Sequence, residues 1–400
     1  MSLEIQEQTE CLSDITNNTS ITEHQIKRKI VLETSEEIEP ITKKSKSKSN
    51  KTTSKWYPPS VTSIEKPFDF KTTTYFSKVP IEIEKLTSEE NENSFIVIGV
   101  DEAGRGPVLG PMVYGISYSL ERFSNDLQNK YGFADSKVLT DDKRQELFKL
   151  IEDETHELNK NVGWATTTIT AKDISSGMLK SKNAGGSGLS YNLNEQAHDV
   201  TIDLIKNVVK LLNNHISMNK IKLFIDTVGP PITYQNKLKN IFPQINEIIV
   251  TKKADSIYSI VSTASVVAKV TRDLNINYFT NTEFTNEVKR NILYNEKLGS
   301  GYPSDPNTNK WLNNIDNIDK LFGWCFGFIR YSWQTTKDCL IKNKCINIIY
   351  EEDCEEYIKK KNGYKKDVYK LMEEENNNNN VKPKFDKSYY VNTFNNGNIL

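Results

Sequence analysis

Short apolar runs, separated by polar segments, occupy the middle of the chain and predict a buried sheet. The first run is Phe95–Val100 (FIVIGV), whose continuous apolar character and short length are typical of a buried strand. β-prone runs follow at 111–118, 162–169, 222–226 and 247–251. The pattern therefore predicts a set of about five strands within one folded region.

Helical periodicity fills the segments between and after these runs. Residues 141–154 predict one helix, and apolar residues recur at helical spacing through 194–212 and 257–271. We interpret these apolar stripes as core-facing surfaces rather than cofactor-binding motifs. Because strands come first and then alternate with helices, we predict an α/β fold in which a mixed sheet is flanked by helices.

The N-terminal part of the chain has a different pattern, rich in Thr, Ser, Glu, Lys and Asn. Such a composition buries too little apolar surface to offset chain entropy, so 1–93 is predicted to be a disordered tail. Its basic stretches, 27–29 and 43–55, are typical of import signals or nucleic-acid tethers, with a solvated tail as the alternative interpretation. The folded domain is then expected to occupy 94–333.

The C-terminal part is charged and polar. Residues 334–372 predict a helical extension, because apolar anchors such as Ile341 and Tyr357 are spaced among charges. The Asn-rich segment 373–400 is predicted to be a low-complexity tail. Within the folded domain, 182–188 (KNAGGSG) has the composition of a loop insertion.

Bulk composition excludes few classes of function. The formal net charge of −1 does not indicate a nucleic-acid binder, yet acidic tails and a cluster of acids can mask a basic groove in the total. The five cysteines form no CxxC pair, which favours free thiols in a reducing compartment. No apolar run reaches the ~18 residues of a membrane span, and no signal peptide is recognisable. We expect a soluble, intracellular protein that does not enter membranes.

Acidic residues lie where predicted strands end. Asp101 and Glu102 directly follow the first apolar strand, Asp226 ends the strand KLFID, and Asp255 precedes a long helix. Adjacent carboxylates at the end of a buried strand repel each other and are costly to desolvate, and a divalent cation relieves that repulsion. Each acid alone could be a helix cap or a turn residue. Acids on three separate segments together favour a metal site.

The ligand types indicate which metal and which chemistry. Clustered acids without Cys or His favour Mg²⁺ or Mn²⁺, and a pair of such ions can activate water and stabilise a leaving 3′ oxygen. We expect Asp101 to bridge the two ions. The four histidines lie outside the acidic segments, so a histidine-activated nucleophile has little support. The segment Gly104–Gly106 permits close backbone approach to a ligand, with a simple tight turn as the alternative.

These residues belong to a set of motifs that resembles type 2 ribonuclease H. The motif at 100–113 (VDEAGRGPVLGPMV) closely resembles that family's signature. Further motifs follow in the family's order, at 134–137 (ADSK), 224–229 (FIDTVG), 253–256 (KADS), 264–273 (ASVVAKVTRD) and 299–305 (GSGYPSD). The match spans about 95–335 and is similar in detail to the catalytic chain of the eukaryotic enzymes.

The resemblance implies a ribonuclease H-like core with a helical C-terminal extension. It also implies an endonuclease that cuts on the 5′ side of ribonucleotides, in RNA–DNA hybrids and in duplex DNA with single embedded ribonucleotides. The products would carry a 3′-hydroxyl and a 5′-phosphate. The implied roles are ribonucleotide removal from DNA and degradation of Okazaki-primer RNA, in the nucleus, with the cytoplasm as a second expected location.

Matching motifs assign roles to individual residues. The resemblance places Asp101, Glu102, Asp226 and Asp255 at the family's metal-binding and catalytic positions. Residues that match substrate-binding positions are Gly104, Arg105, Gly106, Lys137, Arg272 and Tyr302. The glycine-rich turn would sense the 2′-hydroxyl through its backbone, Tyr302 would lie at the RNA–DNA junction, and Lys137 would contact phosphate. For Arg272, the alternative to substrate contact is a purely structural role.

The resemblance further implies a heterotrimer, in which accessory subunits B and C dock against the C-terminal region. Two other interpretations are less favoured. A noncatalytic nucleic-acid-binding scaffold would be expected to have lost an acid, yet all four are present. A resolvase, or a type 1 or type 3 ribonuclease H, is not expected to combine the glycine-rich turn with Tyr302.

Overall fold

The computed structural model describes most of the chain between Trp56 and Ile346. The described residues are 56–62, 71–133, 139–179, 191–227, 229–282, 298–324 and 328–346. Predictions for 1–55, for the loop 182–188 and for 347–400 therefore lie outside the described residues. None of the described helices is long and apolar enough to cross a membrane.

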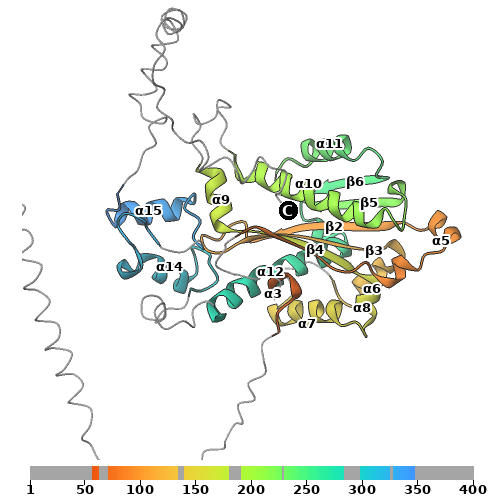
Figure 1. Ribbon diagram of the computed structural model, residues 1–400, viewed down its shortest axis with the longest axis horizontal. Coiled ribbons are helices and arrows are strands. Elements are labelled where there is room, and N and C mark those ends of the chain that lie inside the picture. Colours follow the sequence, from red (N-terminus) through yellow and green to blue (C-terminus); the bar gives the residue numbers. More distant parts are fainter. Residues whose placement is uncertain are drawn as a thin grey trace, which may run out of the picture. The chain divides into compact units, whose positions relative to one another are not determined.

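A six-stranded mixed sheet forms the centre of the fold (Figure 1). Its spatial order is β1-β4-β3-β2-β5-β6. The pairs β1–β4, β4–β3 and β3–β2 are antiparallel, whereas the pairs β2–β5 and β5–β6 are parallel. Their bounds are β1 Thr73–Phe76, β2 Ile96–Ala103, β3 Met112–Leu120, β4 Gly163–Ile169, β5 Ile221–Asp226 and β6 Glu247–Thr251. The predicted mixed α/β sheet is confirmed, and strands occur at all five predicted positions.

The folded region begins earlier than predicted. Residues 1–93 were expected to form a tail, but β1 and three short helices lie at 59–93: α3 (Pro59–Thr62), α4 (Ile81–Glu84) and α5 (Ser88–Asn93). For these residues the prediction was wrong. The segment TTYF lacks a long apolar run, and it forms a strand because it pairs along the edge of β4, where Thr74 and Thr167 share a side-chain hydrogen bond of 2.9 Å.

Helices cover both faces of the sheet. On one face lie α10 (Leu193–Leu212) and α11 (Pro231–Ile241), and on the other lie α12 (Ser259–Thr282) and α7 (Asp141–Glu152) (Figure 1). Each face has its own apolar cluster, because alternate strand residues point to opposite sides. The remaining helices between β3 and α10 are α6 (Ser124–Asn129), α8 (Glu157–Asn161) and α9 (Ala171–Met178).

Two glycines allow α12 to cross the sheet at very short range. A Cβ on Gly99 of β2 would lie 2.4 Å from the backbone of Ile260, and one on Gly115 of β3 would lie 2.7 Å from the carbonyl oxygen of Ala264. Only glycine fits at either position, since real Cβ atoms do not approach backbone so closely. The close crossing brings α12 beneath the end of β2 that carries Asp101.

A third apolar cluster joins the C-terminal part to the sheet domain. It contains Val108 and Leu109 from the loop after β2, together with Trp311 of α14 (Pro306–Asn313) and Cys339 of α15 (Gln334–Lys342). A β-bridge between Leu109 and Ile329 ties the two regions together. The loop that follows the predicted acids is therefore held from the C-terminal side.

Candidate active site

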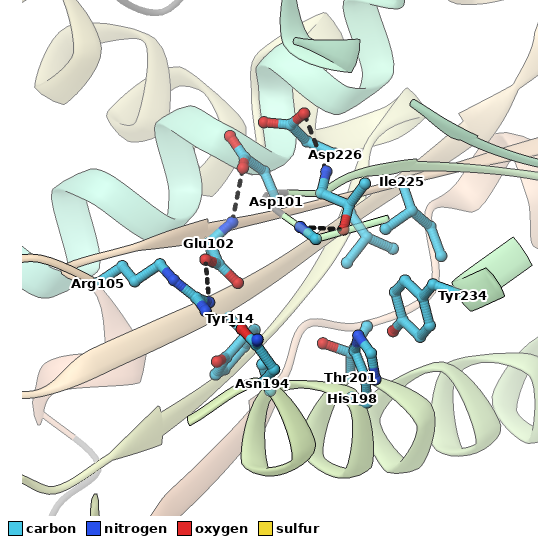
Figure 2. Close-up of a pocket in the computed structure, with 14 residues that line it drawn as sticks. Asp101, Glu102, Arg105, Tyr114, Asn194, His198, Thr201, Ile225, Asp226 and Tyr234 are labelled. Atoms are coloured by element: carbon cyan, nitrogen blue, oxygen red, sulfur yellow. Dashed lines mark hydrogen bonds and ion pairs between the residues drawn. The ribbon is translucent and has the colours of Figure 1, made fainter. Parts of the chain in front are cut away.

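Parallel pairing of β2 and β5 brings Asp101 and Asp226 together. Val100 lies opposite Ile225 in the register, so Asp101 and Asp226 follow as neighbours at the same edge of the sheet. Asp101 is only 7% exposed, whereas Asp226 is partly exposed. Figure 2 shows both carboxylates at one pocket, with Glu102 next to them.

The electrostatics of this group favour bound cations. Burial, together with the neighbouring charge of Asp226, raises the pKa of Asp101 to about 7 against opposing hydrogen bonds. Burial also raises the pKa values of Glu102 and Asp226, and the charge of Asp255 adds to the shift at Asp226. Desolvated like charges resist ionisation together, so a divalent cation would stabilise the ionised cluster.

A left-handed turn holds Asp226 in place. Its carboxylate accepts hydrogen bonds from the backbone N–H groups of Thr227 at 3.0 Å and Ala254 at 3.2 Å. Lys253 adopts a left-handed conformation with φ 59°, which turns the chain into the short 3₁₀ helix Ala254–Ser256. The same turn carries the buried Asp255, so one local geometry positions both acids.

Glu102 is held by Arg105 from the following turn. The guanidinium of Arg105 lies 3.0 Å from a carboxylate oxygen of Glu102, and it also contacts the side chain of Asn194 on α10. This bridge joins the end of β2 to the start of α10 (Figure 2). Arg105 thus orients an acid as well as lying on the pocket wall.

The residues present fit a hard divalent cation. Asp101, Glu102 and Asp226 line the same pocket and offer only carboxylate oxygens, the ligands preferred by Mg²⁺ and Mn²⁺. Among the described residues, no three acidic, histidine or cysteine side chains already stand at metal-binding geometry. Side-chain rotations would therefore be needed to bring the carboxylates around an ion. The four metal-site assignments remain predictions.

The glycine-rich turn and Tyr302 lie against each other. Gly104 has φ 84°, and a Cβ there would lie 2.8 Å from the carbonyl oxygen of Pro111. A Cβ on Gly106 would lie 3.4 Å from the ring of Tyr302, which is 42% exposed. The carbonyl of Gly301 accepts a hydrogen bond of 2.8 Å from the N–H of Val108. Tertiary packing therefore joins two motifs that lie about two hundred residues apart in the chain. Together they form one surface at which Gly106 and Tyr302 are exposed.

Two other predicted substrate residues have different outcomes. Arg272 is 4% exposed and donates to the carbonyl of Ser300 at 2.7 Å, while its guanidinium carbon lies 5.5 Å from the centre of the Tyr302 ring. These contacts with the Tyr302 loop fit the structural alternative, and contact with substrate remains a prediction. Lys137 lies outside the described residues.

A buried arginine that sequence patterns did not single out supports the glycine-rich turn. Arg330 is 0% exposed and donates to the carbonyls of Gly110, Arg105 and Pro111 at 3.0, 3.2 and 2.8 Å. The indole N–H of Trp333 donates to the carbonyl of Gly106 at 3.3 Å. The only sequence signal was a single charge within the run 328–333 (FIRYSW), which is rich in aromatic residues.

The far wall of the pocket comes from α10 and α11. Asn194, His198 and Thr201 of α10 and Tyr234 of α11 line it, and the His198 ring stacks on Tyr234 at 3.9 Å (Figure 2). Burial lowers the pKa of His198, which favours a neutral imidazole. The histidines had little support as site residues from the sequence, because they lie far from the acids along the chain. Packing of α10 over the sheet brings this one to the same pocket.

Comparison with known proteins shows which family the chain resembles. The family model for Ribonuclease HII matches residues 98–336. The chain is 49% identical over 255 residues to the A subunit of ribonuclease H2 from Schizosaccharomyces pombe, covering 64% of this chain and 70% of the relative. It is 42% identical over 268 residues to the corresponding chain of Dictyostelium discoideum, covering 67% and 85%.

The crystal structure of ribonuclease H2 from Pyrococcus horikoshii OT3 is 28% identical in sequence, with a TM-score of 0.45, and the overlap covers 62% of this chain and 99% of that one. The family match includes the acidic strand ends, the glycine-rich turn and Tyr302, and it extends over more than half of the chain. The chain therefore belongs to the ribonuclease HII family of endoribonucleases.

Proposed function

We propose that this protein hydrolyses the phosphodiester bond on the 5′ side of ribonucleotides, both in RNA–DNA hybrids and in duplex DNA with single embedded ribonucleotides. One observation carries the proposal: the ring of the exposed Tyr302 lies next to Gly106, three residues beyond the end of β2, the strand that carries Asp101 and Glu102. A backbone turn and an aromatic hydroxyl together suit recognition of a ribose, because the 2′-hydroxyl is both donor and acceptor.

The chemistry follows from the donor set. Asp101, Glu102, Asp226 and Asp255 would hold two Mg²⁺ or Mn²⁺ ions. When bound, such ions supply Lewis acidity for the attacking water and for the leaving 3′ oxygen. The chain's own residues orient this site, since Arg105 holds Glu102 and the 253–254 turn holds Asp226. The expected products carry a 3′-hydroxyl and a 5′-phosphate.

Substrate positioning would use the surface between the glycine-rich turn and Tyr302. The exposed Gly106 leaves the turn's backbone open to a sugar, and Tyr302 combines a stacking face with a hydroxyl. Phosphate contact is assigned to Lys137 by the family resemblance. Arg272 would act either directly or by supporting the Tyr302 loop from beneath.

The chain also has features suited to partner subunits. The curated relatives are each named as the A subunit of ribonuclease H2, which implies an assembly of several chains. Five of the exposed large apolar side chains among the described residues lie in the C-terminal part: Ile315, Leu321, Phe322, Ile341 and Ile346. A hydrogen bond from the N–H of Ile346 to the carbonyl of Lys320 brings two of these segments together. We propose that accessory subunits B and C cover this region and the segment 347–372.

The cellular role proposed for this activity is ribonucleotide removal from DNA, together with degradation of Okazaki-primer RNA. Both tasks place the protein in the nucleus, and the basic stretches at 27–29 and 43–55 are suited to nuclear import. Fluorescence imaging of the full chain, with and without those basic residues, tests the location. Unchanged nuclear signal after their replacement would remove them as import signals.

A cleavage assay tests the proposed activity directly. Three duplexes are compared with Mg²⁺ and with Mn²⁺: a continuous RNA–DNA hybrid, duplex DNA with one ribonucleotide, and all-DNA duplex. We expect cleavage 5′ of the ribonucleotide in the first two and none in the third. Asp226→Asn keeps the side-chain shape but weakens binding of hard cations, so activity should fall by orders of magnitude while the circular dichroism spectrum is retained. Near-normal activity of that variant, or full activity in EDTA, would contradict the two-ion mechanism.

A further inference from the structure

The N-terminal segment Trp56–Thr62 packs against the helix that supports the Tyr302 loop. Val61 and Ser60 of this segment are 0% and 3% exposed, so the segment is part of the core rather than a surface tail. It contains α3, which packs on α12 beside α7 (Figure 1). We refer to Trp56–Thr62 as the N-terminal strap.

Specific contacts fix the strap to the C-terminal half of α12. The hydroxyls of Ser60 and Thr271 lie 3.0 Å apart in the interior, where Thr271 is 0% exposed. The Tyr57 hydroxyl donates to the side-chain carbonyl of Asn277 at 3.1 Å, and its ring packs edge-on against Tyr278 at 5.0 Å. A buried hydroxyl pair and an aromatic pair contribute directional contacts in addition to apolar burial.

The same half of α12 faces the substrate-recognition surface on another side. Arg272 packs 3.3 Å from the position of a Cβ on Gly104, and Ile276 packs 3.1 Å from that of a Cβ on Gly110. Residues four apart lie on one face of a helix, whereas residues one apart point about 100° away from each other. Thr271 therefore faces the strap while Arg272, next to it, contacts the glycine-rich turn and the Tyr302 loop.

The two halves of α12 are held in different ways. The N-terminal half lies on the sheet, where Gly99 and Gly115 admit Ile260 and Ala264. The C-terminal half is divided between two apolar clusters: Leu274 belongs to the cluster that contains Val61 of the strap, and Ile276 belongs to the one that contains Val108 and Leu109 of the loop. The strap consequently opposes the loop across the helix, and its removal would leave one side of this half open to solvent.

We infer that the N-terminal strap is a positioning element for ribonucleotide recognition, acting through α12 and Arg272 on the Gly104–Gly106 turn and the Tyr302 loop. The inference rests on the proposed function, because it assigns the recognition of a single ribose to that surface. The contacts described for the strap are with α12 and α7 rather than with the predicted catalytic acids. Its loss should therefore affect the choice between substrates more than the chemical step, since small displacements of positioning groups have large effects on rate.

Deletion variants provide the main test. The full chain, a chain lacking residues 1–55 and a chain lacking 1–62 each carry a C-terminal tag and are purified from the native cell, so that any partner chains accompany them. We expect removal of 1–55 to leave kinetics unchanged. Removal of 1–62 should lower kcat/KM about tenfold for duplex DNA with one ribonucleotide and much less for a continuous hybrid. A synthetic peptide of residues 50–66, added in trans, should restore the ratio between the two substrates.

Point variants keep the inference testable if the shorter chain folds poorly. Tyr57→Ala removes the hydrogen bond to Asn277 and the ring contact with Tyr278. It should lower the ratio of kcat/KM on the single-ribonucleotide duplex to kcat/KM on the hybrid. Tyr57→Phe keeps the ring and should retain most of that ratio. Thr62→Ala is the matched control, because Thr62 is the exposed end of the strap. Equal losses on both substrates that follow the folded fraction would show that the strap only stabilises the fold, and would overturn the inference.

Hydrogen exchange separates this inference from the proposed function. We expect faster amide exchange in 271–278 and 298–302 after removal of 1–62 or in Tyr57→Ala, with the strands β2 and β5 unchanged. Unchanged exchange in 271–278 would overturn the positioning role whatever the kinetics show. If the full chain cleaves neither ribonucleotide substrate, the proposed function fails, and the exchange data alone then decide whether the strap positions the loop.

Discussion

At the scale of single residues, the carboxylates proposed to bind metal ions also destabilise the metal-free fold. Asp101 is almost fully buried beside Asp226, and its pKa is raised from 3.8 to about 7. Between about pH 3.8 and pH 7, Asp101 therefore keeps its proton in the folded protein but has lost it in the unfolded chain. The free energy of unfolding of the metal-free protein must fall as the pH rises through this window, and the penalty is complete above about pH 7.

This linkage predicts that Asp101→Asn stabilises the metal-free protein while abolishing cleavage. A shift of about three pKa units corresponds to an upper bound of about 4 kcal/mol, so we expect the Tm at pH 8 in EDTA to rise by several degrees. The variant should also show a flatter dependence of Tm on pH between 5 and 8. Thermal unfolding followed by circular dichroism measures both. Asp203→Asn, on a partly exposed site of α10, is the control and should change neither.

Tyr302 has the exposure expected of a recognition residue. The residue is 42% exposed and its ring lies next to Gly106, so Tyr302→Ala should cost little stability. We expect this variant to lower cleavage at a single embedded ribonucleotide by about tenfold more than cleavage of a continuous hybrid, because the hybrid offers many ribose contacts. Tyr302→Phe should be intermediate if the hydroxyl participates. Parallel losses on both substrates, accompanied by a lower Tm, would instead assign Tyr302 a structural role.

At the scale of elements, the crossing of α12 over β2 and β3 determines where the site lies. Gly99 and Gly115 permit the crossing, and the helix then carries Arg272 to the glycine-rich turn. The sequence showed apolar periodicity in this helix but gave no sign of its distance from the sheet. Gly99 and Gly115 are the only local signal that another element approaches the strands closely. Only the packed structure shows that they face Ile260 and Ala264 of α12.

The close crossing predicts that Gly99→Ala is severely destabilising. A Cβ 2.4 Å from backbone atoms of Ile260 requires α12 to move, which should cost about 3 kcal/mol or more. Gly132→Ala is the matched control: its φ is 72°, but nothing lies within 4 Å of the new Cβ, so the cost should be about 1 kcal/mol. Urea unfolding measures both. Similar small losses for the two variants would mean that α12 is free to shift away from the sheet.

At the scale of the whole molecule, the described fold leaves apolar side chains uncovered near its C-terminal end. Phe322 and Ile341 are 73% and 74% exposed, and both belong to the region proposed to bind partner subunits. Isolated exposed apolar residues are ordinary, but several of them in neighbouring segments suit the partner surface proposed above. The named relatives are single subunits of an assembly, which supports the same conclusion.

Purification of the tagged chain from its native cell should recover two further subunits. Phe322→Glu should reduce their recovery strongly, because a charge in an apolar interface is costly to desolvate. Ile232→Glu is the control, since Ile232 is 76% exposed on α11 and lies outside the proposed surface. Size-exclusion chromatography coupled to light scattering measures the assembled mass. A fully active wild-type chain that is monomeric in such extracts would contradict the heterotrimer.

Local sequence patterns determined the strands β2 to β6, the long helices and the acids that end β2 and β5. Each of these depends on residues that are neighbours in the chain, such as Phe95–Val100 before Asp101. Tertiary structure alone decided that β1 and the strap belong to the fold, because TTYF and PSVT gain their stability from β4 and α12 rather than from their own composition.

The site shows the same division. The types of its acids and the glycine-rich turn were visible in the sequence, and the family resemblance supplied Tyr302. The pairing of Asp101 with Asp226, the support from Arg330 and the arrival of His198 at the pocket required the register of β2 with β5 and the packing of distant helices. A periodic pattern shows which face of an element is buried, but the identity of the group it is buried against is set by long-range contacts, whose formation depends on the whole chain.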